Sequence, residues 1–456
     1  MNGLQDPDKR CIIRVTGGID MSERLTLGLF VLALILCLVT GLPILAALAA
    51  GLVIFMLYGR KKGFSWKELL HMAVMGVFTA RNVLLTFLLI GMLTALWRMA
   101  GTIAVLVSWA SVLIRPSIIV LITFLLNCLL SVLTGTSFGT SATMGVICAT
   151  MGQAMGADMR LLGGAVVAGA YFGDRCSPVS TSALLVSELT GTNIFDNIRD
   201  MVRSCIVPFA VSGLLYFVLG RSTAAHAAEL NLREMFSAEF SLHPAAFLPA
   251  AVIMVLSVMR VPVKKAMLAS ILTAIPAALF LEHRTLYETL HCAYFGFAAS
   301  DAAVAKLMNG GGIVSMFRVF GIVCLSSSYG GIFRETGLLD GIRSQVEAFA
   351  GKTTEYAATM LTAILTGSVA CNQTLSIILT HQLCSGIPQK KEKLALDLED
   401  TAVVIAPLIP WSIAGTVPLA AVGAPLSGLL FAFYLYLLPL WRAAGSFAAA
   451  RKQSKI

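Results

Sequence analysis

The chain has 456 residues, of which 57% are hydrophobic and only 12% are charged. Soluble domains carry about 25% charged residues, so this composition excludes an ordinary soluble protein and indicates a membrane protein with several spans. The net charge of +9 does not indicate a nucleic-acid partner, because Lys and Arg gather in short loops, as the positive-inside tendency requires.

Neither the N-terminal segment nor the cysteines indicate a secreted, zinc-binding or disulfide-stabilised protein. Residues 1–24 are mixed in charge and lack a short apolar core with a cleavage site, so we expect a cytoplasmic tail, not a signal peptide. The ten cysteines form no C-x-x-C pair and no cluster with histidine, which gives no support to a zinc site or a disulfide framework. We expect no cofactor.

The first predicted element is an uncharged segment from Leu25 to Gly59, interrupted by Gly41-Leu42-Pro43. It is short for two full spans and therefore predicts a tight helical hairpin. Arg60-Lys61-Lys62 follows at once, which places both ends of the hairpin on the cytoplasmic side. An uncharged span over 82–97 and a short apolar segment over 103–114 come next.

The stretch from Pro116 to Ala157 contains no charged side chain and no histidine. It is long enough for two membrane crossings of about 20 residues each. Its centre, Leu133 to Ser141, is nevertheless rich in Gly, Thr and Ser, which is the wrong composition for a lipid-facing helix. Opened backbone at membrane depth persists only where protein or a wet cavity satisfies its polar groups, so we expect an interrupted helix in the interior.

A carboxylate ends the next apolar segment. Residues 161–172 lead to Asp174, and Ser177-Pro178 follows. A bare carboxylate in hydrocarbon is costly, so its presence here suggests a cation or proton site. Arg175 is the next residue, and a structural ion pair between Asp174 and Arg175 is therefore the alternative.

A polar connection over 221–244 divides the chain into two transmembrane halves, which we place at 25–220 and 245–441. A basic tail over 442–456 follows and should be cytoplasmic. The histidines of the connection, such as His226, fit an ordinary solvated loop better than a pH sensor.

The second half repeats the order of events in the first. Leu133-Thr134-Gly135 recurs as Leu365-Thr366-Gly367, and Asp174 with its following proline is answered by Asp400 with Pro407. Each half thus has a polar interruption in an apolar segment, then a carboxylate and a proline. Paired interrupted segments in corresponding positions are typical of secondary transporters that are built from repeats.

The residue types at these interruptions suit a transported cation. Na⁺ binds best to carboxylate, hydroxyl and carbonyl oxygens, and unwound helices expose carbonyls. The candidate residues for a cation and proton site are Asp174, Ser177, Thr136, Ser137, Asn372, Gln373, Asp400 and Thr401. Competition of Na⁺ and H⁺ for one carboxylate is enough to couple the two fluxes.

Each of these residue types also has a purely structural explanation. Asp400 and the neighbouring Glu399 follow a charged loop, where a helix N-cap is the alternative. Asn372 and Gln373 could hydrogen-bond between helices, and the Thr and Ser residues are common in helix packing. The sequence contains no nucleotide-binding loop, no G-x-S-x-G and no H-E-x-x-H, so an enzyme gains no support.

Three motifs resemble the NhaC family of Na⁺/H⁺ antiporters, within the ion-transporter superfamily. Residues 135–140 look like its G-T-S-[WF]-G-T, and residues 169–178 are similar to its G-A-Y-F-G-D-[KR]-x-S-P. Residues 398–411 resemble its L-E-D-[ST]-x-x-x-x-x-P-L-[IV]-P-W. The resemblance runs from about Arg81 to Pro439 and implies the family's fold and cation/proton exchange.

The chain departs from the family pattern in two places. Where typical members read S-D-T-T-N, this chain has Ser180-Thr181-Ser182-Ala183-Leu184, which keeps hydroxyls but loses the Asp and the Asn. Ala402-Val403 stands where the family usually has Gly-Thr. The resemblance also extends to exchangers of organic acids against cations, so it implies the fold more firmly than the transported species.

We therefore expect an all-α polytopic protein of the plasma membrane, with about ten to twelve helical elements in two repeat-related halves, broken or re-entrant helices and cytoplasmic termini. The expected function is Na⁺/H⁺ antiport. The alternative is a Na⁺- or H⁺-coupled transporter of a small amino acid or carboxylic acid; a channel or scaffold is disfavoured. The expected partners are Na⁺, H⁺, the lipid bilayer and, in the alternative, the organic solute, without nucleic acid. A homo-oligomer is left open.

The sequence finally predicts unequal roles for the two aspartates. Asp174 follows an apolar segment and precedes Ser177-Pro178, so it should lie deepest and carry the exchanged proton. Asp400 follows the charged loop that contains Lys390 and Lys393, so it should lie nearer water.

Overall fold

The computed structural model describes residues 21–453 except 41, 114, 179, 225–235, 238, 260, 302–303, 306–307 and 337–342. Across these residues the chain is helical, and its only β-type pairing is an isolated bridge between Phe297 and Gly310. The expected all-α architecture is confirmed. The predictions for the N-terminal tail, for its cytoplasmic location and for His226 lie outside the described residues.

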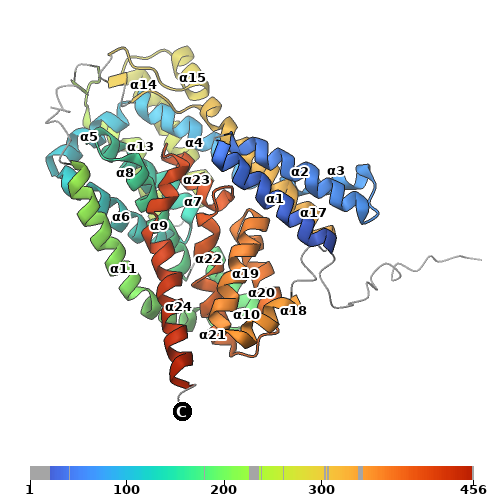
Figure 1. Ribbon diagram of the computed structural model, residues 1–456. Coiled ribbons are helices and arrows are strands. Elements are labelled where there is room, and N and C mark those ends of the chain that lie inside the picture. Colours follow the sequence, from blue (N-terminus) through green and yellow to red (C-terminus); the bar gives the residue numbers. More distant parts are fainter. Residues whose placement is uncertain are drawn as a thin grey trace, which may run out of the picture.

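Figure 1 shows the helices of the described part of the chain. Those before residue 225 are α1 (Met21–Thr40), α2 (Ile44–Lys61), α3 (Trp66–Thr79), α4 (Arg81–Met99), α5 (Thr102–Leu113), α6 (Ile119–Thr134), α7 (Ser137–Thr140), α8 (Val146–Ala154), α9 (Met159–Cys176), α10 (Thr181–Thr190) and α11 (Ile194–Ala224). Those after it are α13 (Leu248–Val258), α14 (Val263–Phe280), α15 (Leu286–Phe295), α17 (Phe317–Thr336), α18 (Arg343–Lys352), α19 (Glu355–Ala370), α20 (Gln373–Cys384), α21 (Lys391–Glu399), α22 (Ala402–Ile405), α23 (Ile413–Ala421) and α24 (Phe433–Gln453).

Three helices in the described part of the chain are long and apolar enough to cross a membrane, at 116–134, 194–221 and 313–333. Two bent pairs bring the total to as many as five. One of them joins α4 to α5 at a bend of 69°, where Gly101 has a φ of +69°. The sequence separates these helices into two elements, and the structure joins them as the two arms of one bent pair.

The first hairpin and α17 form a packed unit with a core of their own. The predicted hairpin over 25–59 is confirmed, since α1 packs against α2, and α17 packs against both α2 and α3 (Figure 1). Phe30, Phe55, Tyr329 and Phe333 make ring contacts inside this unit. A larger core joins α4–α9, α11, α13, α14 and α19–α24.

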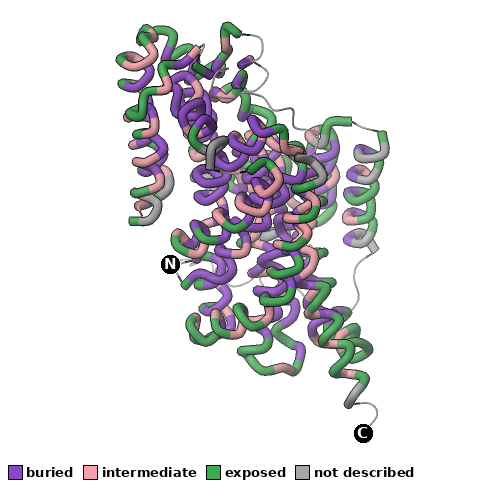
Figure 2. Tube along the Cα trace, turned by 90° about the vertical axis from the view of Figure 1, so that its left-hand side faces the viewer, coloured by how far each residue is buried: buried purple, intermediate pink, exposed green. Residues whose placement is uncertain are grey.

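The helix that carries Asp174 runs through the interior. Nearly every side chain of α9 from Leu161 onward is buried, and Figure 2 shows buried residues filling the centre of the molecule. Small residues allow α6 to approach α9 closely: a Cβ added to Gly173 would meet the backbone carbon of Ser131 at 2.3 Å, and one added to Gly169 would meet the carbonyl oxygen of Phe124 at 2.7 Å.

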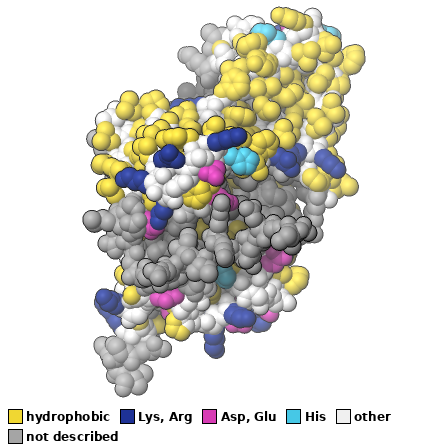
Figure 3. All heavy atoms as spheres, turned by 90° about the vertical axis from the view of Figure 1, so that its right-hand side faces the viewer, with side chains coloured by type: hydrophobic (Ala, Val, Ile, Leu, Met, Phe, Trp, Pro, Cys, Tyr) yellow, Lys and Arg dark blue, Asp and Glu magenta, His cyan; other side chains and the backbone are white. Residues whose placement is uncertain are grey.

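Large apolar side chains cover broad parts of the outer surface, interrupted by Lys and Arg on the face shown in Figure 3. Exposed examples are Leu70, Phe78, Phe280, Leu290 and Phe295. A water-exposed surface of this extent would be unfavourable, whereas lipid solvates it. The surface and the apolar helices are those of an integral membrane protein.

Candidate functional site

The Gly-Thr-Ser stretch interrupts a helix, as the sequence predicts. Helix α6 ends at Gly135, which adopts the left-handed conformation with a φ of 65°. The chain is extended at Thr136, whose hydroxyl caps α7 by accepting from the Gly139 N–H at 2.8 Å. A π-helical turn over 141–145 then leads into α8. Turns of this kind are frequent at functional sites.

The second half contains the same kind of break between α19 and α20. Cys371 is left-handed with a φ of 56°, and Asn372 is extended and caps α20 by accepting from the Leu375 N–H at 2.8 Å. Gly135 therefore corresponds to Cys371, which lies four residues beyond Gly367. The repeated Leu-Thr-Gly sequence therefore locates the second break but pairs Gly135 with Gly367, a residue one helical turn before its structural counterpart Cys371.

The third break, between α9 and α10, surrounds Asp174 with hydroxyl groups. Asp174 is 3% exposed. The Ser180 hydroxyl, which also caps α10, donates to its Oδ1 at 3.0 Å. The Ser182 hydroxyl donates to the Asp174 main-chain oxygen at 3.1 Å, and the two serine oxygens lie 2.9 Å apart. This short polar turn thus folds back on the carboxylate.

The breaks of the two halves meet at this carboxylate. The Gln373 side-chain nitrogen, at the start of α20, donates to Asp174 Oδ2 at 3.1 Å and contacts the Val403 carbonyl oxygen at 3.3 Å. The Ser137 hydroxyl, at the start of α7, is a further polar neighbour of Asp174. Three of the predicted site residues, Asp174, Ser137 and Gln373, are therefore brought together from three separate helices.

Four of the other predicted residues, all except Asp400, bond to the backbone elsewhere. Ser177 donates to the Val132 carbonyl oxygen at 2.7 Å, and Thr401 to the Asp397 carbonyl oxygen at 2.6 Å. Thr136 and Asn372 serve as the helix caps described above. Ser180 and Ser182 are not among the predicted site residues, although the Ser-x-Ser pair that follows the helix-breaking Pro178 is a signal that could have identified them.

Asp400 has an environment that the sequence did not predict. It is fully buried, so its expected position nearer water is wrong. Its Oδ1 accepts from Arg175, and its Oδ2 lies 2.7 Å from Arg442 Nε. Arg175 also donates to the Tyr434 hydroxyl at 3.2 Å. Among the described residues Arg175 therefore pairs with Asp400, 225 positions away, and makes no ion pair with Asp174.

The alternative of a helix N-cap at Asp400 is also wrong. Asp400 follows the last residue of α21, where it forms the C-terminal cap. Glu399 is fully buried, and no described residue donates a hydrogen bond to either of its carboxylate oxygens. The end of α21 thus collects three buried carboxylates, since Asp397 also pairs with Arg442 at 2.9 Å.

The two places where the chain departs from the family pattern do not weaken the contacts of Asp174. Thr181 and Leu184, which replace an Asp and an Asn, are both exposed. Ser180, which the chain retains, and Ser182, which keeps the hydroxyl of the family's Thr, are the residues that bond to Asp174. Val403 supplies a carbonyl oxygen to Gln373, which any residue at that position would provide.

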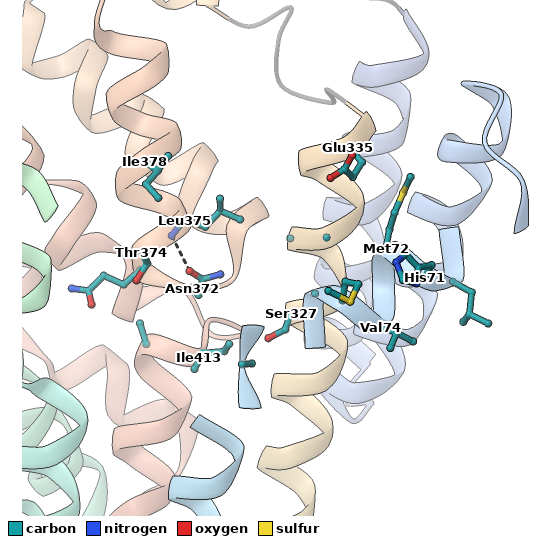
Figure 4. Close-up of a pocket in the computed structure, with 18 of the residues that line it drawn as sticks. His71, Met72, Val74, Ser327, Glu335, Asn372, Thr374, Leu375, Ile378 and Ile413 are labelled. Carbon is teal, nitrogen blue, oxygen red and sulfur yellow. Dashed lines mark hydrogen bonds between the residues drawn. The ribbon is translucent and has the colours of Figure 1, made fainter. Parts of the chain in front are cut away.

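A cavity of about 1140 Å³ opens beside this site. Figure 4 shows α20, with Asn372, Thr374 and Leu375, on one side and α17 and α3 on the other. Gln373, which donates to Asp174, lines the same cavity. Within the described residues no three His, Cys, Asp or Glu side chains are grouped to hold a metal ion. A cation at Asp174 would therefore rest on one carboxylate with hydroxyl, amide and carbonyl oxygens.

Comparisons with known proteins identify the family of the chain. The model of the Na⁺/H⁺ antiporter family matches residues 13–188 and 169–441. The Na⁺/H⁺ antiporter NhaC of Alkalihalophilus pseudofirmus is 28% identical over 85% of this chain and 86% of its own. The malate-2H⁺/Na⁺-lactate antiporter of Bacillus subtilis is 29% identical over 85% of this chain and 86% of its own. The arginine/ornithine antiporter ArcD of Halobacterium salinarum is 26% identical over 82% of this chain and 80% of its own. The chain belongs to the Na⁺/H⁺ antiporter family.

Proposed function

We propose that this protein is a secondary transporter of the plasma membrane that exchanges Na⁺ for protons, with Asp174 as the exchangeable carboxylate. The observation that carries the proposal is the environment of Asp174. It is an almost fully enclosed carboxylate that receives neutral donors from Ser180 and Gln373 and, among the described residues, no ion pair. Family membership supports a transporter rather than an enzyme.

The exchange follows from competition at one group. An enclosed carboxylate without a permanent counter-ion must bind either a proton or a cation, because an isolated buried charge is strongly unfavourable. Ser137, Ser180 and the side-chain oxygen of Gln373 would complete the oxygen shell of a bound Na⁺. Since proton and Na⁺ exclude one another at Asp174, a cycle that alternates access would carry them in opposite directions.

The proposal extends to the architecture. The left-handed caps at Gly135 and Cys371, each followed by an extended capping residue, support two repeat-related halves at 25–220 and 245–441. Three of the candidate residues then support the site at Asp174 without contacting the cation. Asp400 holds Arg175 in place, and Thr401 and Asn372 end or start helices.

The alternative is transport of a small amino acid or carboxylic acid, coupled to Na⁺ or H⁺. It is favoured by the cavity of about 1140 Å³, which is far larger than a cation needs. The names of two relatives, a malate/lactate and an arginine/ornithine antiporter, point the same way.

Proteoliposomes that enclose a pH-sensitive dye distinguish the two functions. Proton release from acid-loaded vesicles on adding external Na⁺ alone supports cation/proton exchange. A proton flux that requires an organic solute supports the alternative. No flux under either condition would refute both.

A further inference from the structure

Two arginines far apart in the sequence lie on adjoining segments. Arg98 is in the last turn of α4, and Arg284 lies in the connection between α14 and α15. This connection passes beside the end of α4, because a Cβ added to Gly101 would lie 2.6 Å from Glu282 Oε1. Helices α14 and α15 are at the end of the molecule opposite the C-terminus (Figure 1), away from the break at Asp174.

Both arginine side chains lie near the buried thiol of Cys292. This thiol donates to the Ala95 carbonyl oxygen at 3.6 Å, a contact that joins α15 to α4. Burial raises the pKa of the Cys292 thiol to about 11, and the positive charges of Arg98 and Arg284 oppose this rise. Two guanidinium groups of like charge are therefore close to one buried atom, where α4 meets α15.

Neither arginine has an anionic partner among the described residues. Both side chains are half-buried, and the Nε atoms of Arg98 and Arg284 are buried without a hydrogen bond. The nearest carboxylates along the chain serve other groups. Glu282 accepts from the N–H and the hydroxyl of Ser241, and the exposed Glu288 completes the N-terminal capping box of α15. Partly buried charges without a counter-ion are unfavourable, so an anion from outside the chain would stabilise them.

A glycine turn fixes the position of Arg98. Gly310 and Gly311 have φ values of +121° and +77°, which glycine adopts readily. A Cβ added to Gly311 would lie 2.7 Å from the main-chain nitrogen of Ala95 and 3.0 Å from Arg98 Nη1. The turn thus contacts both the backbone of α4 and the guanidinium group. Arg98 is held by the fold and is not a freely moving surface side chain.

The surface beside the two arginines is apolar. Phe280 at the end of α14 and Tyr287 in the first turn of α15 are each 76% exposed, and Leu290 and Phe295 of α15 are exposed as well. The opposite face of this ten-residue helix is buried. A short helix with an apolar exposed face, and with tyrosine on that face, is typical of the boundary between lipid tails and headgroups.

We propose that Arg98 and Arg284 bind the phosphate of an anionic phospholipid, whose acyl chains lie along Phe280 and the exposed apolar side chains of α15. Guanidinium groups bind phosphate oxygens through paired, charge-assisted hydrogen bonds. A free phosphate ion offers the same charge but leaves the apolar side chains uncovered, so we assign the site to the lipid. The site is separate from Asp174 and does not depend on which solute the protein transports.

Lipid binding to the purified full-length protein in a neutral detergent tests this inference. The probes are phosphatidylglycerol and phosphatidylcholine with the same acyl chains, and native mass spectrometry counts the lipids that stay bound. Phosphatidylglycerol should bind saturably and about tenfold more tightly, because its phosphate charge is not balanced by a cation in the headgroup. Inorganic phosphate is the source of the same anion without acyl chains. At equal concentration it should not displace phosphatidylglycerol.

The variants make the test specific. In Arg284→Gln the affinity for phosphatidylglycerol should fall about tenfold while that for phosphatidylcholine stays unchanged, which a misfolded protein would not produce. Arg98→Gln should have the same selective effect. Arg115→Gln, which alters a single exposed arginine after α5, is the matched control and should bind both lipids as the wild type does.

Three results would overturn the inference. Equal affinity of the wild type for the two lipids would show that the arginines do not select a charge. Unchanged binding of phosphatidylglycerol in Arg284→Gln would place the lipid elsewhere. Displacement by inorganic phosphate at equal concentration would show a site for a soluble anion, to which the acyl chains contribute nothing.

Discussion

Asp174 and Asp400 are both buried and both lie at a helix break, but they are neutralised in different ways. Asp174 receives two neutral donors, the Ser180 hydroxyl and the Gln373 amide, and no described cation pairs with it. Asp400 lies between Arg175 and Arg442. Asp174 is therefore available to bind a mobile cation or a proton, whereas the negative charge of Asp400 is already compensated by two arginines.

This difference is the basis for proposing a transport role for Asp174 and a structural role for Asp400, two carboxylates that follow corresponding interruptions in the two halves of the sequence. A buried ion pair adds little net stability, but removing one partner leaves an uncompensated charge in the interior. A carboxylate with neutral donors can be neutralised without that penalty. Each substitution below tests one side of the contrast.

The largest effect on transport is expected for Asp174→Asn. The amide fills the same space but can neither release a proton nor balance a cation, so Na⁺-driven proton flux should fall to the level of empty vesicles at every pH. The variant should purify in normal yield. Asp196→Asn, an exposed aspartate of α11, is the control. Exchange that persists in Asp174→Asn would remove Asp174 from the mechanism.

Asp400→Asn should lower the stability of the protein more than it lowers the intrinsic rate of transport. It leaves Arg175 without its carboxylate partner in a fully buried position, which is expected to lower the free energy of unfolding by about 3–5 kcal/mol. The thermal unfolding midpoint in detergent measures this. Asp158→Asn breaks the exposed pair with Arg160, whose side chains are 27% and 55% exposed, and should cost less than about 1 kcal/mol.

A double variant checks that the Arg175–Asp400 pair is the cause. Replacing both by apolar residues, as in Arg175→Met with Asp400→Leu, removes both buried charges, so its unfolding midpoint should lie above that of Asp400→Asn. A double variant that is no more stable than Asp400→Asn would show that the two residues act independently.

Gln373→Ala should have a smaller effect on transport than Asp174→Asn. It removes the donor that α20 supplies to Asp174. Hydrogen bonds to charged groups contribute about 1.5–3 kcal/mol, so the Na⁺ concentration for half-maximal flux should change by about tenfold or more. Thr374→Ala alters the next residue on the same helix without touching Asp174, and its half-maximal concentration should be unchanged. Equal values for the two variants would contradict a role for Gln373 at the carboxylate.

The smallest effect is expected for Ser180→Ala. It removes the other donor to Asp174 and the N-cap of α10, which should lower stability by about 1 kcal/mol and flux a few-fold. Thr181→Ala changes the adjacent exposed residue and should leave both quantities unchanged. A loss of flux in Thr181→Ala equal to that in Ser180→Ala would indicate that the segment, and not the Ser180 hydroxyl, is what matters.

The sequence by itself determined the kind of protein and where its chain breaks. Hydrophobic composition predicts membrane helices, and Gly, Thr, Ser and Pro inside apolar segments predict interruptions, because both depend on local chemistry. Gly135 could be predicted as a left-handed helix cap because glycine is the residue that most readily adopts this conformation. Cys371 could not, because a non-glycine residue takes that conformation only when the surrounding fold imposes it.

Only the tertiary structure decided which partner each charge has. Arg175 adjoins Asp174 in sequence but bonds to Asp400, because the side chain of each residue leaves α9 in a different direction. Gln373 reaches Asp174 across 199 positions because the first residue of α20 lies beside the end of α9. Charge compensation depends on such long-range contacts, and no local pattern encodes them. The sequence therefore identified the two aspartates, and the packing of the helices gave them different environments.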